Sequence, residues 1–353
     1  MENAEVVATL ALALAPGVGP QRLRLLISTF GSAQAALAAP HSGVKAARAD
    51  GERVLAQLAE LGARVLLAGD PEFPPQLEEI RDAPPLLYVR GDAALLTRPI
   101  VAIVGSRDHT PYGAEAARIL ASAVAARAVV VSGMARGIDA IAHHAALDAG
   151  GRSIGVLGNG FGVVYPESNR ALYDRMAAHG CLVTEHPPWQ KPHTGSFPRR
   201  NRLISGLARA VVVVEADKNS GALNTAVEGA SQGRAVLAVP GPITSATSFG
   251  TNHLIQDGAK PVLNAADILE EIGISTGLRE LGAALSTPAP RVPPVDLTGL
   301  QLALWHRMTA EPQHVDALVG AAATDPSDVL GALTELELRG LVRQGPGMVF
   351  GLT

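Results

Sequence analysis

Residues 100–113 read IVAIVGSRDHTPYG, a short apolar run followed by a polar turn and then by a helix-like segment. Six further apolar runs, many of them rich in β-branched residues, recur along the chain, and helix-like stretches separate them. Continuous apolar strands that alternate with amphipathic helices are typical of a mostly parallel sheet covered on both faces. The pattern therefore predicts a Rossmann-like, doubly wound α/β core. Strands are expected at 100–104, 129–132, 153–157, 181–184, 210–215, 235–239 and 261–263.

Two proline-rich stretches separate this core from the ends of the chain. Five prolines between Asp70 and Gly91 lead us to expect no regular helix there, and four prolines between Ser286 and Asp296 predict a semi-rigid linker. A chain of 353 residues is also long enough for two or three domains. The predicted division is an N-terminal helical domain of the helix-hairpin-helix (SAM-like) type at 1–70, an extended lead-in segment at 71–99, the core at 100–280, the linker at 281–296 and a winged-helix domain at 297–353.

The two end domains are predicted from smaller patterns. Residues 15–32, APGVGPQRLRLLISTFGS, resemble a helix-hairpin-helix whose turn can present amides to a DNA phosphate, although a tight turn between packed helices explains them equally well. Helices near 297–308, from about 314 and at 326–339, followed by two strands around 345–347, suggest a winged helix. Because its third helix is acidic, we expect it to contact protein rather than phosphate. The residues concerned are Asp325, Asp328, Glu335 and Glu337, against the single Arg339.

The overall charge excludes proteins that hold an anionic polymer through bulk charge. The formal net charge is −4, so any nucleic-acid site must be a local patch. Cys181 is the single cysteine, which excludes an intrachain disulfide and a multi-cysteine metal cage and fits a reducing compartment. The apolar run from Val6 to Ala15 is far too short to span a bilayer. We therefore expect a cytoplasmic protein that does not act at a membrane.

The segment from Pro187 to Val214 contains no aspartate or glutamate, although the protein as a whole is mildly acidic. Its cationic side chains can neutralise phosphates, and Phe197 offers a ring on which a base can stack. This combination predicts a groove for a single-stranded nucleic acid, with a solvated basic face as the alternative. The cationic residues are Lys191, Arg199, Arg200, Arg202 and Arg209.

Other residues of the expected site follow the predicted strands, at the edge where α/β sheets bind their ligands. Arg107 lies on the first of these loops and Arg136 on the second. Small residues between a strand and a helix can offer backbone amides to several phosphates. Tyr112 and Tyr165 are weaker stacking candidates, because a structural role in a turn explains them better. The small residues are Ser106, Ser132, Gly133, Ser220 and Gly221.

Motifs for nucleotide cofactors and for hydrolytic catalysis are missing. Arg107 occupies the position that the second glycine of G-x-G-x-x-G would need, and no G-x-x-x-x-G-K-[ST], H-E-x-x-H or G-x-S-x-G occurs. His143 and His144 lie in a predicted alanine-rich helix, which favours a packing or surface role. Asp139 is expected to cap or line the start of that helix. We therefore expect no catalytic residue, no cofactor and no metal.

Five motifs occur in order along the core: VAIVGSR (101–107), VSGMARGIDAIAHHAAL (131–147), GVLGNGFGVVYPESN (155–169), FPRRNRLISGLARAVVVVEA (197–216) and SGALNTA (220–226). Together they resemble the DprA/Smf family (DNA processing protein A). The resemblance implies a cytoplasmic bacterial protein without known catalysis that binds single-stranded DNA and forms a homodimer through its Rossmann-like domain. It also implies a role in DNA recombination and competence: the family helps to load the RecA recombinase onto strands covered by single-strand-binding protein, notably in natural transformation.

The resemblance also carries over residue by residue. The family's DNA pocket falls on Arg107 of the G-S-R turn and on the F-P-x-R-N-R motif, and the S-G-x-x-x-T-A turn would supply amides for phosphate. Some members carry a lysine ahead of the phenylalanine; Thr194 stands near that place here, with Lys191 and His193 as possible substitutes. Asn224 and Glu228 depart from the usual pattern. The predicted DNA-binding set is Ser106, Arg107, Gly133, Arg136, Lys191, Phe197, Arg200, Asn201, Arg202, Gly221, Asn224 and Thr225.

Two other function classes remain open at this point. The first is a Rossmann-like nucleotide-processing enzyme of the nucleoside-monophosphate phosphoribohydrolase type, whose phosphate turn and glutamate resemble NSGALNTAVEG (219–229). That reading lacks the glycine trio of those enzymes and leaves the arginine cluster unexplained. The second is an interaction scaffold built from the helical and winged ends, which would leave the core loops without a task.

Overall fold

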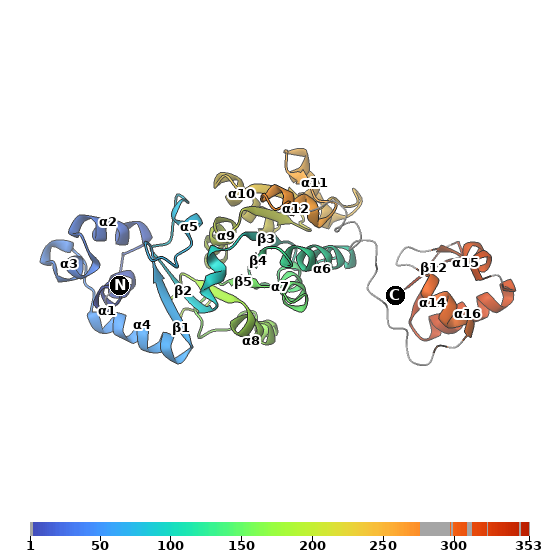
Figure 1. The fold of residues 1–353 in the computed structure, drawn as a ribbon, viewed down its shortest axis with the longest axis horizontal. Coiled ribbons are helices and arrows are strands. Elements are labelled where there is room, and N and C mark those ends of the chain that lie inside the picture. Colours follow the sequence, from blue (N-terminus) through green and yellow to red (C-terminus); the bar gives the residue numbers. More distant parts are fainter. Residues whose placement is uncertain are drawn as a thin grey trace. The chain divides into compact units, whose positions relative to one another are not determined.

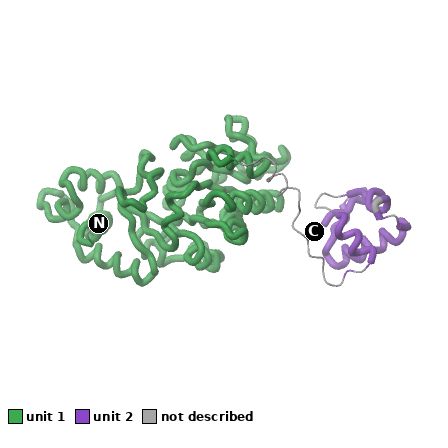
Figure 2. Tube along the Cα trace, viewed as in Figure 1, with its two compact units in different colours: residues 1–282 green, residues 283–353 purple. Residues whose placement is uncertain are grey.

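The computed structural model, drawn in Figure 1, describes residues 3–275, 297, 299–308, 313–322, 324–345 and 347–352. The chain forms two compact units, Met1–Gly282 and Ala283–Thr353, which Figure 2 shows in different colours. Each unit has its own hydrophobic core. The predicted proline-rich linker at 281–296 lies outside the described residues.

Unit 1 is built around a nine-stranded sheet with the order β1-β2-β6-β5-β4-β3-β7-β8-β9 (Figure 1). From β6 to β9 in this order all neighbours are parallel, so the predicted mostly parallel, doubly wound core is confirmed. Each run that was predicted as a strand overlaps one, and β3 to β7 are fully buried, where apolar and β-branched residues fit a sheet that is covered on both faces. The edge strand β9 is the exception, because it is not buried and meets the predicted run 261–263 only at Pro261. The bounds are β3 Ile100–Val104, β4 Val129–Ser132, β5 Ser153–Val156, β6 Cys181–Thr184, β7 Ala210–Val213, β8 Ala235–Ala238 and β9 Lys260–Pro261.

Two antiparallel strands that the sequence did not predict extend the sheet at one edge. β1 (Ala63–Leu67) pairs with β2 (Leu86–Gly91), and β2 pairs with β6. The five prolines of the preceding segment all stand before β2 begins, so none of them removes a hydrogen-bond donor from it. The expectation that this segment holds no helix is wrong over α5 (Pro75–Glu78). Pro75 occupies the first helical position, where its missing N–H would have no helical partner in any case.

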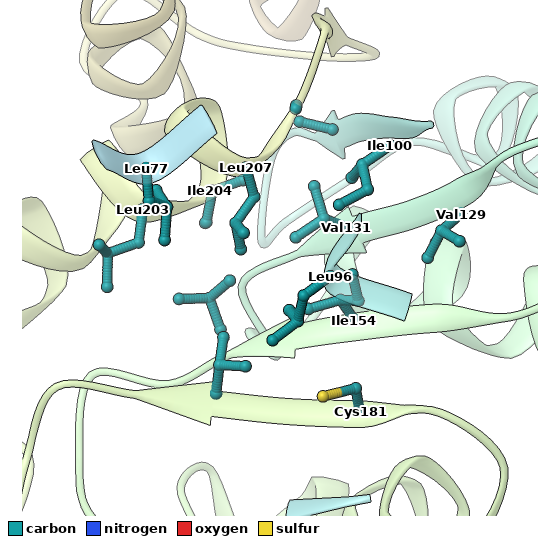
Figure 3. Close-up of a cluster of buried hydrophobic side chains, with 14 of the residues drawn as sticks. Leu77, Leu96, Ile100, Val129, Val131, Ile154, Cys181, Leu203, Ile204 and Leu207 are labelled. Atoms are coloured by element: carbon teal, nitrogen blue, oxygen red, sulfur yellow. The ribbon is translucent and has the colours of Figure 1, made fainter. Parts of the chain in front are cut away.

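Helices cover both faces of the sheet. On β3, Ile100 faces the core beneath α5, α9 and α10, and Val101 faces the core beneath α6, α7 and α12. Figure 3 shows the first core, where Leu203 and Leu207 of α9 lie close to the strands. The helices are α6 Pro111–Ala125, α7 Ile138–Asp148, α8 Arg170–His179, α9 Ser196–Leu207, α10 Gly221–Ser231, α11 Phe249–Gln256 and α12 Ala265–Glu271, with 3-10 turns at Pro40–Ser42, Ala93–Thr97, Glu167–Asn169 and Ala246–Ser248.

The N-terminal segment is helical, and a short turn joins its first two helices. Leu12 and Leu23 pack together in a small core of their own, whereas Leu10 joins the core that the segment shares with the edge of the sheet. In the turn, Gly17 has a φ of +75°, a conformation that L side chains rarely adopt. Gly19 then precedes the first residue of the second helix. The helices are α1 Asn3–Leu14, α2 Pro20–Phe30, α3 Ala33–Ala38 and α4 Arg48–Glu60.

Unit 2 has the three helices and the hairpin that were predicted for a winged helix. Its small sheet has the order β10-β12-β11. Leu304, Leu333 and Phe350 are buried in its core. Within the described part of unit 2, β10 is the element that was not expected, because two residues are too short to show any periodicity. The elements are α14 Gly299–Arg307, β10 Gln313–His314, α15 Val315–Ala322, α16 Pro326–Leu338, β11 Val342–Gly345 and β12 Val349–Leu352.

Candidate nucleic-acid interface

A cleft of about 540 Å³ opens at the carboxyl ends of β3 and β7, the two adjacent strands at which the chain reverses its direction across the sheet. The helix that follows β3 covers one face of the sheet and the helix that follows β7 covers the other, so the two loops diverge and leave a crevice. The start of α9 forms a further wall. We call this the switch-point cleft. Of the predicted site residues it is lined by Ser106, Arg107, Phe197, Arg200, Asn201, Gly221, Asn224 and Thr225.

Two aromatic rings and one guanidinium group lie close together in the lining of the cleft. The ring centroids of Tyr165 and Phe197 lie 5.4 Å apart, and the guanidinium of Arg107 lies 5.8 Å from the Phe197 centroid. Tyr165 is 45% exposed and lines the cleft. The sequence ranked Tyr165 as a weaker stacking candidate than Phe197, but in the structure the two rings are neighbours in the same lining. Tyr112, the other weaker candidate, instead donates its hydroxyl to the carbonyl of Pro240.

A smaller cavity of about 50 Å³ adjoins the cleft and contains two more predicted residues, Gly133 and Arg136. Arg107, Tyr165 and Phe197 line both spaces. The exposed Arg136 therefore adds a second cation beside the aromatic pair. Ten of the twelve predicted residues thus line one of the two adjoining spaces.

The loop after β4, which carries Arg136, is held from two sides. The N–H groups of Gly133 and Ala135 donate to Oδ2 of Asp139 at 3.1 and 3.4 Å. Nδ2 of Asn169 donates to the carbonyls of Met134 and Ala135 at 3.1 and 3.2 Å. Asp139 therefore lines the start of α7, as expected, and it accepts the Gly133 N–H that the sequence had assigned to phosphate.

Gly137 brings this loop against the loop after β3. It has a φ of +77°, and a Cβ at this position would lie 2.4 Å from the carbonyl oxygen of Ser106. That carbonyl accepts the N–H of Ile138 at 3.1 Å. A glycine is required here because two backbones meet, and the contact fixes the loop that carries Arg107.

Arg200 lies at the base of the cleft, where it holds the ends of two strands together. Its side chain donates to the carbonyls of Gly133 and Val156, and the residue is only 6% exposed. Burial lowers the pKa of Arg200, and the carboxylate of Asp139 opposes that shift. A Cβ on Gly133 would collide with this guanidinium, so the packing of Arg200 alone explains why residue 133 is a glycine, and no contact with phosphate is needed to explain it. Nη1 of Arg200 thus has internal hydrogen-bond partners, whereas its buried Nε has none among the described residues.

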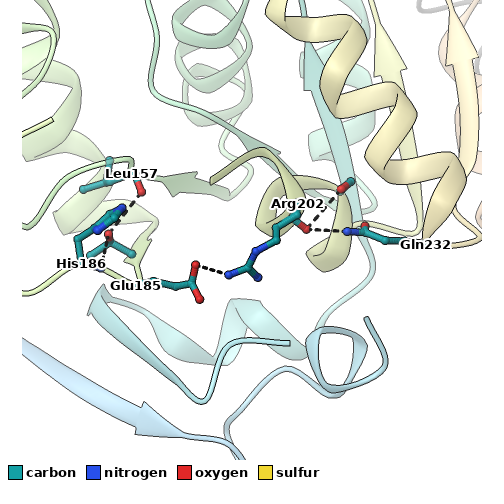
Figure 4. Close-up of polar contacts among 7 residues, drawn as sticks. Leu157, Glu185, His186, Arg202 and Gln232 are labelled. Carbon is teal, nitrogen blue, oxygen red and sulfur yellow. Dashed lines mark hydrogen bonds and ion pairs between the residues drawn. The ribbon is translucent and has the colours of Figure 1, made fainter. Parts of the chain in front are cut away.

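Arg202 faces away from the switch-point cleft. Figure 4 shows its guanidinium paired with the carboxylate of Glu185, and both side chains are mostly buried, with 11% and 16% exposed. Its carbonyl accepts a hydrogen bond from Gln232 at 3.1 Å. Lys191 is exposed on the loop before α9, but it lines neither the cleft nor the adjoining cavity. These two predicted residues are therefore separate from the other ten.

The remaining lining is polar and lies close to the start of α10. Asn201 donates to the carbonyl of Gly221 at 3.4 Å, which ties α9 to α10. Ser220 caps α10 by accepting the N–H of Ala222. The N-terminus of this helix carries a partial positive charge that favours an anion. Sequence reasoning missed several residues of the cleft, among them the carboxylates that limit its positive charge. The missed lining residues include Asp108, Pro198, Ile204 and Asp217.

The two histidines of α7 have the packing and surface roles that the sequence predicted. His143 is fully buried, and its Nδ1 lies 2.7 Å from Oγ of Ser153. Burial lowers the pKa of His143 to about 3. His144 contacts Arg175 at the surface. Across the described residues, no group of three or more histidine, cysteine, aspartate or glutamate side chains is placed to hold a metal ion.

None of the helices described in the structure combines the length and the apolar character that crossing a membrane requires.

Comparison with known proteins gives concordant matches for both units. The sequence profile for "DNA recombination-mediator protein A" matches residues 64–273, and that for "DprA winged helix domain" matches residues 288–348. DNA processing protein DprA of Bacillus subtilis is 42% identical over 222 residues, which cover 62% of this chain and 75% of that protein.

Two solved structures are similar to this chain at more than 30% identity. DNA processing protein A from Streptococcus pneumoniae has a TM-score of 0.65 at 33% identity, covering 77% of this chain and 98% of that one. The protein of the same name from Helicobacter pylori has a TM-score of 0.54 at 31% identity, covering 59% of this chain and 94% of that one. The Helicobacter structure is described as giving insights into a single-stranded DNA binding mode.

Proposed function

The chain belongs to the DNA recombination-mediator protein A family, and we propose that it binds single-stranded DNA in the switch-point cleft as a recombination mediator. The observation that supports this most directly is the grouping of Arg107, Phe197 and Tyr165 in the lining of one 540 Å³ space. Proteins that bind single strands combine cations that follow the phosphates with rings on which bases stack. Both components are present here within a few ångströms of each other.

The residues of the cleft divide into three tasks. Arg107 and Arg136 neutralise phosphates, and Phe197 with Tyr165 provides the surface for one or two bases. The N-terminus of α10, together with the exposed Asn224, receives a further phosphate. Arg200 supports the cleft from below through its bonds to backbone carbonyls, and its buried charge adds to the positive potential.

We propose that the protein acts without catalysis. The carboxylate of Asp139 is used by backbone N–H groups and its neighbour Arg200, so it is part of the loop structure. The alternative phosphoribohydrolase function would need the glutamate of NSGALNTAVEG beside the ribose. Glu228 instead lines a different groove, together with residues of α2. This position disfavours the enzyme.

The wider role follows from family membership. We propose that the protein protects incoming single strands in the cytoplasm and helps to load RecA onto strands covered by single-strand-binding protein, in natural transformation and competence. We also propose that it acts as a homodimer, and the exposed Leu263 beside the edge strand β9 is an apolar position that such a dimer could cover. The exposed Asp325, which caps α16, and the exposed Asp328 and Glu335 within it would repel phosphates, so we propose that unit 2 contacts protein.

The proposal is tested by fluorescence anisotropy with labelled oligothymidine and with a duplex of equal length, across a salt series. We expect tighter binding of the single strand and a linear fall of log K with log salt concentration. A parallel assay follows RecA ATPase activity on strands coated with single-strand-binding protein, with and without the full-length protein. Equal affinity for the duplex would contradict the assignment of the cleft. Release of free base from a nucleoside monophosphate would establish the enzyme instead.

A further inference from the structure

A second groove, of about 630 Å³, lies on the other side of α9 from the switch-point cleft. One wall is the start of α2, from Gly19 to Arg24, and the other is α9. We call it the arginine groove. Its lining residues are Gly19, Pro20, Gln21, Arg22, Arg24, Asp82, Pro198, Arg199, Arg202 and Glu228.

The geometry of α9 connects the two spaces. Residues three or four apart lie on one face of a helix, so Phe197 and Asn201 face the switch-point cleft whereas Arg199 and Arg202 face the arginine groove. Pro198 lines both. Arg199 is two residues beyond Phe197, about 3 Å along the helix axis and about 200° around it, so the two side chains leave opposite sides of α9. A strand with a base on Phe197 therefore has to cross α9 at Pro198 to reach the arginine groove, a path on the order of one or two nucleotides because the helix is about 10 Å across.

The charges of the arginine groove suit an anionic backbone. Four arginines and two carboxylates, Asp82 and Glu228, line the groove, and Gln21 donates to Asp82 at 3.3 Å. Glu185 pairs with Arg202, which leaves one N–H group of that guanidinium, Nη1, buried and without a hydrogen-bond partner among the described residues. Nε of Arg24 is in the same state. Unsatisfied buried donors are unusual in proteins, and a bound phosphate close to these two side chains would supply the missing acceptors after a small rearrangement.

The remaining two arginines complete the groove at its surface. Arg199 is exposed. Arg22 is held by hydrogen bonds to the carbonyls of Gly17 and Gly43, at 3.3 and 3.5 Å, which also support the turn between α1 and α2. The lining contains no aromatic side chain, in contrast to the switch-point cleft. The arginine groove therefore offers contacts to phosphates and no surface on which bases stack.

We propose that a single DNA strand continues from the switch-point cleft across Pro198 into the arginine groove, where Arg22, Arg24, Arg199 and Arg202 hold the phosphates of the next nucleotides. This inference rests on the proposed function, because the strand must first occupy the cleft. It assigns a DNA-contacting task to the helical hairpin at the N-terminus. It also explains why the acid-free segment continues past Phe197 on both faces of α9.

The test compares a short and a long strand on the full-length protein. Fluorescence anisotropy is measured with dT6, which the switch-point cleft alone can hold, and with dT20, for the wild type and Arg199→Glu. Arg98→Glu is the matched control, since Arg98 is also exposed but lies just before the amino end of β3, away from the carboxyl ends of the strands that line the cleft. We expect Arg199→Glu to lower the dT20 affinity at least tenfold and the dT6 affinity less than threefold. The dT20 salt slope should decrease by about 0.7 for each phosphate that the variant no longer neutralises.

Other outcomes separate the possible failures. Arg22→Ala, checked for intact folding by circular dichroism, should repeat the length-dependent loss in a milder form. Equal effects of Arg199→Glu on both strands, or no effect on either, would overturn the proposal while leaving the cleft assignment in place. A loss confined to a duplex probe would show that the arginine groove holds double-stranded DNA and would also overturn it. Failure of the wild type to bind dT6 would instead contradict the proposed function of the cleft.

Discussion

The guanidinium of Arg107 lies 5.8 Å from the centroid of the Phe197 ring, although Arg107 lies on the loop after β3 and Phe197 lies in the first turn of α9. Gly137 and Ser106 bring the loops after β3 and β4 together, and this backbone contact fixes the loop that carries Arg107. The pairing of Arg107 with Phe197 joins the charge and the stacking surface in one place. A base that lies on Phe197 therefore has a cation next to its own phosphate.

The first prediction concerns that cation. Arg107→Ala should weaken single-strand binding by about 1.5–3 kcal/mol, which is roughly ten- to a hundredfold, since it removes one hydrogen bond to a charged group. It should also reduce the slope of log K against log salt by about 0.7. The exposed side chain is not needed for folding, so the melting temperature should stay the same. Anisotropy titrations at several salt concentrations measure both quantities, and an unchanged slope would show that Arg107 touches no phosphate.

The second prediction concerns the rings. Phe197→Ala and Tyr165→Ala should each cost about 1–3 kcal/mol in affinity if each ring carries a base, with no change in the salt slope, because stacking releases no counterions. Phe197→Tyr should retain most of the binding. Phe249→Ala is a suitable control, since Phe249 is also exposed but packs on His253 outside the cleft. If Phe197→Ala also reduced the slope of log K against log salt concentration, Phe197 would act by positioning Arg107 and not by stacking on a base.

The fold was predictable where the sequence contains long enough apolar runs. A strand such as β3 is buried on both faces, so its five residues are uniformly apolar and are recognised without any alternation. β2 was missed because the prolines just before it dominated the interpretation of that segment. β10 was missed because two residues carry no period.

The composition of the site was more predictable than the partners of its side chains. Arg107 and Phe197 stand in recognisable motifs. The sequence could not show that Glu185, just outside the acid-free segment, folds back onto Arg202, or that Asp139 accepts the amide of Gly133. These contacts join residues on different elements, and only the packed structure brings them together.

The third prediction separates support from contact at Arg200. Arg200→Ala should destabilise the protein by about 3–5 kcal/mol, because it leaves the buried carboxylate of Asp139 without its compensating charge. The exposed neighbour serves as the control: Arg199→Ala should change the free energy of unfolding by less than about 0.5 kcal/mol. Urea unfolding at neutral pH measures both values. Adding Asp139→Asn should recover part of the loss, since the two residues are coupled. If Arg200→Ala kept the stability of the wild type but lost DNA binding, Arg200 would contact the DNA directly and would not be a supporting residue.

The last prediction concerns the pH dependence of stability. His143 is fully buried against Ser153, and burial lowers its pKa to about 3, with the charges of His144 and Arg200 adding to the shift. In the unfolded chain its pKa is about 6.5. Between these values the unfolded state binds a proton that the folded state does not. The stability that neutral His143 preserves is therefore complete above pH 6.5 and declines as the pH falls toward 3.

The loss approaches about 1.4 kcal/mol for each pH unit below 6.5, so the free energy of unfolding should be lower by about 2 kcal/mol at pH 5 than at pH 7.5 on account of His143 alone. His186, whose pKa burial lowers to about 4, adds a loss in the same direction. Urea unfolding measures the free energy of unfolding at both pH values. The difference of about 2 kcal/mol that is due to His143 should disappear in His143→Gln and remain in His41→Gln, since His41 is exposed. If His143→Gln kept the full pH dependence, the imidazole would be taking up its proton in the folded protein as readily as in the unfolded chain.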